Sequence, residues 1–101
     1  MKIRYAPQAK KDLEEIRDYI AVKLRNPDAA AATTRRITRD ALRLTRQPYL
    51  GVSVEEKTGK RTDARILVSG KYWVVYEVHE HIDVLRILDT RMDFFRNLGS
   101  F

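Results

Sequence analysis

The stretch from residue 65 to residue 89 restricts the fold more than any other part of the chain. It holds three runs rich in β-branched and aromatic residues, at 65–69, 72–79 and 82–89, and only two residues separate each run from the next. Such runs joined by two-residue breaks are typical of β-hairpins, so the pattern predicts a three-stranded antiparallel meander. A sheet of this kind has an apolar face that it cannot cover alone, and it therefore needs a second layer.

The first half of the chain supplies that layer as two amphipathic helices. The first helix begins at Pro7, and its apolar face is formed by Ala9, Leu13, Ile16 and Ile20. Asp12 lies early in this helix, where the helix dipole favours negative charge. A second helix is predicted from 27 to about 46, since the segment 26–28 is a helix-start signal and Pro48 ends it. Its inward stripe consists of Ala30, Thr34, Ile37, Ala41 and Leu44.

The remaining segments complete an α+β fold. Residues 2–6 alternate as a short strand, residues 48–64 are interpreted as a loop with a short strand near 52–54, and residues 90–98 as a terminal helix. We expect a single domain over residues 1–101: N-terminal strand, helical hairpin, three-stranded antiparallel meander and short C-terminal helix. The helices should pack on one face of the sheet. Function is expected on the other, open face.

Composition narrows the functional classes. The chain has 101 residues, enough for one core, and no cysteine, which excludes disulfides and thiolate chemistry. No segment approaches the roughly 20 apolar residues of a membrane helix, so we expect a cytoplasmic protein without a membrane partner. Its 20 Lys and Arg exceed its 14 Asp and Glu, giving +6. This excess favours an acidic partner, either nucleic acid or protein, unless it serves only solubility.

A basic stripe follows the second predicted helix. Arg35, Arg39, Arg43 and Arg46 recur at spacings of four, four and three, and Arg36 lies beside them. Residues with this spacing line one side of a helix. The stripe can serve phosphates or an acidic partner segment, or it can be an ordinary solvated face.

A second set of arginines falls on the predicted sheet region: Arg61, Arg65, Arg86 and Arg91. Simple alternation places Arg86 on one strand face with Ile82, Val84 and Leu88. An arginine in an apolar strand needs a partner. For Arg86 alone we favour an ion pair with Asp63, Glu77 or Asp89, whereas the cluster as a whole favours anion binding.

The histidines and the tryptophan give weaker functional signals than the arginines. His79 and His81 flank a turn and lack a third ligand for a metal, so we expect neither a metal nor any other cofactor. Trp73 lies in the most strand-like run. A lone tryptophan in a strand is expected to be a core residue, or, on the open face, a surface that stacks on a base or anchors a peptide. The sequence contains no nucleotide-binding glycine loop and no nucleophile elbow.

Three segments in order resemble the RelE/ParE family of bacterial toxins. They are residues 5–20, which resemble the first helix of these toxins, residues 70–78, and residues 84–93. Together they extend over nearly the whole chain. The resemblance implies a toxin of a type II toxin–antitoxin system, neutralised by a cognate antitoxin in a hetero-oligomer.

The family has two target classes, and the resemblance is closer to ParE-like members, which inhibit DNA gyrase. RelE-like members cut messenger RNA on the ribosome with basic residues on the sheet face and often a C-terminal tyrosine. Here Trp73 stands where those members carry a basic residue, and the C-terminal segment has Phe94 and Phe95. Ile66, Leu67 and Val68 stand where catalytic lysines are expected. RNA cleavage needs a proton acceptor and cationic stabilisation of phosphate, so these departures favour a binder over an enzyme.

The resemblance also assigns surfaces. Antitoxin-binding residues are predicted to be Leu13, Ile16, Ile20, Arg35, Arg36, Arg39 and Arg43. Target-binding residues are predicted to be Arg65, Trp73, Arg86, Arg91, Phe94 and Phe95. Two alternatives stay open. One is a metal-independent, ribosome-dependent endoribonuclease using Arg61, Arg65, Arg86 and Arg91, and the other is a non-toxic binding module with the same fold.

Overall fold

The computed structural model of the chain describes residues 1–91. Its helical elements are α1 (Pro7–Asp18), a π-helical turn (Tyr19–Lys23), α2 (Pro27–Leu42), a 3-10 turn (Arg43–Thr45) and α3 (Val54–Thr58). Its strands are β1 (Ile3–Tyr5), β2 (Val52–Ser53), β3 (Arg65–Ser69), β4 (Tyr72–Val78) and β5 (Ile82–Asp89). The predicted terminal helix at 90–98, with Phe94 and Phe95, extends beyond the described residues.

The strands form one mixed sheet in the order β1-β5-β4-β3-β2. The meander β3-β4-β5 is antiparallel, as the two-residue breaks predicted, and Ser69 pairs with Tyr72 across the first turn. In that turn Gly70 has a φ of 60°, a value that favours glycine. β1 adds to β5 in parallel and pairs only with Ile82–Val84, so the rest of this β5 edge is left to α1.

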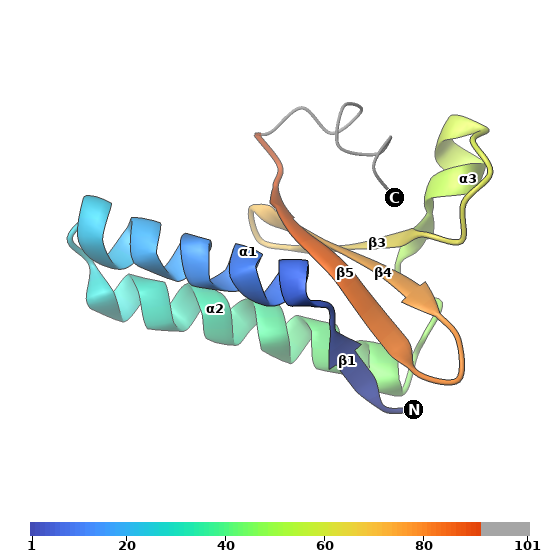
Figure 1. Cartoon of the computed structure of the whole chain (residues 1–101), viewed down its shortest axis with the longest axis horizontal. Helices are drawn as coiled ribbons and strands as arrows, with labels where there is room; N and C mark the ends of the chain where they lie inside the picture. The colour runs from blue at the N-terminus through green and yellow to red at the C-terminus, as the bar shows by residue number, and fades with distance from the viewer. Residues whose placement is uncertain (92–101) are drawn as a thin grey trace.

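The two long helices lie side by side on one face of the sheet, as predicted (Figure 1). The main core between the layers contains Ala9, Ile37, Ala41, Leu44, Leu67, Val74, Tyr76, Ile82, Val84 and Ile87. The predicted stripe of α2 is buried at Ala30, Ile37, Ala41 and Leu44. In α1 the burial is less regular. Leu13 and Ile16 are half-buried, while the charged Asp12 is only 5% exposed.

The opposite face of the sheet is partly covered by a second, smaller cluster. It consists of Val54, Ala64, Ile66, Val75 and Leu88, with Trp73 packed against it. Val54 belongs to α3, which lies away from the two long helices (Figure 1). The face that we expected to be open is therefore open only beyond α3.

The prediction of loop without helix across residues 48–64 is wrong at α3. Ser53 caps this helix, because its side-chain oxygen accepts a hydrogen bond from the Glu56 amide at 3.2 Å. Gly59 ends it in the left-handed conformation at a φ of 74°. The short strand expected near 52–54 is present as β2.

A β-bulge in β5 overturns the predicted alternation of that strand. Val75 of β4 pairs with Arg86 while Tyr76 pairs with Val84, so Leu85 is the extra residue. Ile82 and Val84 therefore belong to the core against the helices, whereas Leu88 belongs to the second cluster. These residues do not share one face, because the extra residue shifts the alternation by one.

Candidate functional site: a basic groove beside the helical hairpin

Two adjoining hollows lie where the end of α1 and the π-helical turn meet the β3–β4 turn and the end of β5. Their volumes are about 450 Å³ and about 260 Å³. Tyr19, Tyr72 and Arg91 line both, so the hollows adjoin, and the two together are called the groove below. The larger volume is within the range typical of binding pockets, about 300–1,000 Å³.

The larger hollow combines an apolar wall with positive charge. Ile20, Leu24 and Ile37 supply apolar surface from the hairpin, and Leu24 is 55% exposed. Arg36 and Lys71 line the same hollow together with Arg91. Arg36 also forms a loose ion pair with Asp40, at 3.8 Å, while Asp40 accepts a 2.7 Å hydrogen bond from the Ser69 hydroxyl. A segment that carries both apolar and acidic side chains fits these walls.

The smaller hollow contains an ion pair that joins the sheet to α1. Arg86 donates to the Asp12 carboxylate through Nε at 2.9 Å and through Nη2 at 3.2 Å. Asp12 also accepts from the backbone amide of Ile87 at 2.9 Å and from the Gln8 side chain at 3.0 Å. The hydrogen bond to Asp12 raises the pKa of Arg86. The predicted ion pair of Arg86 therefore forms, but its partner is Asp12 and not Asp63, Glu77 or Asp89.

The cause lies in the edge of β5. Because β1 stops pairing at Val84, the Ile87 amide has no acceptor on a neighbouring strand. It donates instead to a side chain of α1. A buried carboxylate with several donors satisfies this amide and the guanidinium together. Asp12 was expected only to complement the helix dipole. Its place beside the apolar positions Ala9 and Ile16, three and four residues away, is the signal that sequence reasoning missed.

Arg91 closes the other end of the smaller hollow. It donates to Asp89 through Nη2 at 2.8 Å, Nε at 3.1 Å and its backbone amide at 2.8 Å. Hydrogen bonds from Arg91 lower the pKa of Asp89. The Arg91 side chain is 72% exposed and so keeps a free surface for a ligand. Burial, followed by the charge of Asp89, raises the pKa of the Tyr72 hydroxyl.

Arg65 does not join Arg86 and Arg91. It pairs with Tyr76, on the side of the long helices, whereas Arg86 pairs with Val75 of the second cluster. Its Nη2 donates to the carbonyls of Gly51 and Tyr49, at 2.7 and 3.3 Å, and its guanidinium lies over the Tyr49 ring. Arg65 therefore holds the segment after α2 in place. Arg61 is exposed between α3 and β3.

Trp73 does not line the groove. It is half-buried and, with Val52, Val68 and four other residues, lines an apolar hollow of about 220 Å³. Val68 is 62% exposed beside it. The structure thus places Arg86 and Arg91 in the groove and Trp73 in a separate hollow that shares no lining residue with it.

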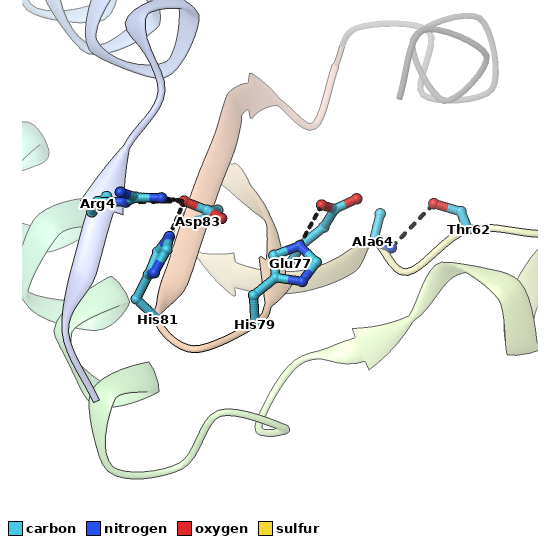
Figure 2. A network of polar contacts seen from close by, with 7 residues as sticks. All are labelled: Arg4, Thr62, Ala64, Glu77, His79, His81 and Asp83. Carbon is cyan, nitrogen blue, oxygen red and sulfur yellow. Dashed lines mark hydrogen bonds and ion pairs between the residues drawn. The ribbon is translucent and has the colours of Figure 1, made fainter.

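The two histidines engage carboxylates around the β4–β5 turn (Figure 2). His79 contacts Glu77 at 2.9 Å, and His81 contacts Asp83 at 2.9 Å. Asp83 also accepts from Arg4 on the parallel neighbour β1, at 3.5 Å. The hydrogen bond to Glu77 raises the pKa of His79. Among residues 1–91, no three His, Cys, Asp or Glu side chains gather as metal ligands.

The predicted antitoxin-binding residues divide between two surfaces. Ile20 and Arg36 line the larger hollow and Ile16 lines the smaller one. Leu13 is half-buried against the core beside them. Arg35, Arg39 and Arg43 are exposed on the side of α2 that faces away from its buried stripe. Sequence reasoning did not single out Tyr19, Lys71 or Tyr72, which the groove brings together.

Comparison with known proteins agrees with the fold and the earlier resemblance. The family model for the ParE toxin of the type II toxin–antitoxin system parDE matches residues 3–94. The chain belongs to this ParE toxin family. A solved structure titled as the chromosomal ParDE toxin–antitoxin system from P. aeruginosa matches with a TM-score of 0.73 and 22% identity, covering 88% of this chain and 95% of that one.

That likeness concerns the fold. A search of curated proteins finds no significant match. Within residues 1–91, no helix is long and apolar enough to span a membrane.

Proposed function

We propose that this ParE-family chain inhibits DNA gyrase by binding it, and that a cognate antitoxin neutralises it by placing a segment in the basic groove. The observation that carries the proposal is the groove itself, which combines apolar residues of the hairpin with Arg36, Lys71 and Arg91. Family membership supports the toxin–antitoxin setting.

The groove suits an amphipathic, acidic segment. Apolar side chains of such a segment pack on the exposed Leu24 and the apolar surface beside it, and its carboxylates pair with Arg36, Lys71 and Arg91. An antitoxin seated there covers Arg91 and reaches Arg86, which are both predicted to contact the target. Neutralisation then follows from direct competition for these residues.

Binding without chemistry is supported by the arginines themselves. Arg86 is paired with Asp12, Arg65 with two backbone carbonyls, and Arg91 with Asp89. Arg65 lies apart from Arg86 and Arg91, and each of the three is already engaged by acceptors of the protein itself. A ribonuclease needs such cations gathered beside a proton acceptor.

Inducible expression in a bacterial host tests the proposal. We expect growth arrest with a DNA-damage response and intact messenger RNA. Arrest with rapid cleavage of translated messages would assign the chain to the ribonuclease class. Soluble, folded protein that causes no arrest would identify a non-toxic binding module.

Groove variants test the antitoxin site separately. Lys71→Glu combined with Arg91→Glu reverses two charges in the groove and should weaken neutralisation by the antitoxin. The matched control, Lys10→Glu combined with Lys11→Glu, reverses two exposed charges of α1 that do not line the groove. Equal neutralisation of both variants would remove the groove as the antitoxin site.

A further inference from the structure

The outer side of α2 and of the 3-10 turn that follows it presents a row of arginines without ion pairs in the described part of the chain. Arg35, Arg39, Arg43 and Arg46 are all exposed, and none of them has an ion pair within residues 1–91. They follow spacings of four, four and three, so they line the side opposite the buried Ile37 and Leu44. This outward row is called the arginine row below.

No acidic side chain between Arg35 and Arg46 lies on the outer side of the helix. Asp40, the one acid between Thr33 and Arg46, faces Arg36 and the Ser69 hydroxyl on another side of α2. Arg35, Arg39 and Arg43 extend over about 12 Å of helix at 1.5 Å per residue, and Arg46 follows at the end of the 3-10 turn.

The composition of the row favours a polyanion over a protein partner. Protein interfaces have an apolar centre, which the groove offers and the row lacks. Leu42, 57% exposed, is the one exposed large aliphatic side chain between Arg35 and Arg46. The arginines are spaced along the helix at about 6 Å per turn of four residues, which suits repeated phosphates.

The same row distinguishes between nucleic acids. Single-stranded binding needs aromatic side chains on which bases stack, and α2 contains no aromatic residue. Duplex RNA has a major groove too narrow for protein side chains to enter, whereas that of B-DNA admits an α-helix. From these observations we propose that the arginine row of α2 binds the phosphate backbone of duplex DNA. This surface is separate from the groove and goes beyond the proposed inhibition of gyrase.

The test is the salt dependence of binding to a short fluorescein-labelled DNA duplex of mixed sequence, measured with the full chain by fluorescence anisotropy. Each phosphate contact contributes about −0.9 to the slope of log affinity against log salt, so four contacts give a slope between about −3 and −4. The triple variant Arg35→Gln, Arg39→Gln, Arg43→Gln should lose about three contacts and weaken binding at least about tenfold at moderate salt.

Two further variants separate the row from net charge and from folding. Lys10→Gln, Lys11→Gln, Arg17→Gln removes three charges from exposed positions of α1 and should change the slope by less than about one contact. Arg35→Lys, Arg39→Lys, Arg43→Lys keeps the charge and should keep the binding. Circular dichroism confirms that each variant is folded.

Three results would overturn the proposal. One is an equal loss of DNA binding in the α1 and α2 glutamine variants, which would make the binding a matter of net charge. Another is duplex RNA bound as tightly as DNA. The third is polyglutamate peptide bound through the row by a chain that does not bind DNA, which would assign the row to an acidic protein such as the antitoxin.

Discussion

The arginines of the sheet and those of α2 differ in what surrounds them. Arg86 is held by a carboxylate that is almost completely buried, and Arg65 by backbone carbonyls and an aromatic ring. Arg35, Arg39 and Arg43 project from α2 without an ion pair in the described part of the chain. The comparison indicates two roles for arginines of the same formal charge. Those of the sheet hold segments together, and those of the outer helix side leave their charge available to a partner.

Removal of Asp12 should cause the largest loss of stability among the variants that test this difference. Asp12→Ala leaves the Arg86 guanidinium and the Ile87 amide without their acceptor, and breaking a buried pair in this way typically costs about 3–5 kcal/mol. Urea unfolding monitored by circular dichroism measures the loss. The double variant Asp12→Leu, Arg86→Met should recover the part of the loss that comes from the unpaired Arg86, while the Ile87 amide still lacks its acceptor. A single variant as stable as the original chain would contradict the role given to this pair.

Arg65 comes next in expected effect. Arg65→Ala removes the donors to Gly51 and Tyr49 and the contact with the Tyr49 ring, which should lower the free energy of unfolding by about 2 kcal/mol. Arg61→Ala, at an exposed position, is the control and should lie within about 0.5 kcal/mol of the original chain. Equal effects of the two substitutions would show that Arg65 does not fasten the segment after α2.

The pair of Asp89 and Arg91 should give a smaller, pH-dependent effect. Arg91 lowers the pKa of Asp89 in the folded state, so its stabilisation is present above the unfolded pKa of Asp89 and is lost as pH falls through the folded value. Since Arg91 is exposed, solvent screening keeps this stabilisation small. NMR titration of Asp89 in Arg91→Gln should show its pKa return toward the ordinary value. An unchanged titration would mean that Arg91 does not pair with Asp89 in solution.

The row of α2 should matter least for stability. Arg39→Gln combined with Arg43→Gln removes neighbouring like charges from an exposed helix side, so the unfolding free energy should stay within about 0.5 kcal/mol. Thermal unfolding at low salt provides the measurement. A loss of several kcal/mol would show that these arginines have structural partners, and the contrast with Arg65 and Arg86 would disappear.

The sequence predicted what depends on local pattern. The meander followed from the breaks at Gly70-Lys71 and Glu80-His81, and the buried side of α2 followed from the spacing of Ala30, Ile37, Ala41 and Leu44. The helix α3 had a local signal too. Ser53 stands three residues before Glu56, the spacing of a helix-capping pair, but the charged residues around it were interpreted as loop.

What the sequence could not give depends on contacts between distant segments. The bulge at Leu85 shifts the alternation of β5, and this strand contains no glycine or proline that would have indicated a bulge. The partnership of Asp12 with Arg86 joins residues 74 positions apart and follows from where β1 stops pairing. The groove likewise exists only because the π-helical turn, the β3–β4 turn and the end of β5 meet.

Inhibition of gyrase by the purified chain is the most direct test of the proposed function. The assay follows supercoiling of relaxed plasmid by purified DNA gyrase with increasing amounts of the chain, with a parallel sample of translating ribosomes and messenger RNA. The account predicts that supercoiling stops while the messenger stays intact. Unimpaired supercoiling together with cleaved messenger would contradict it.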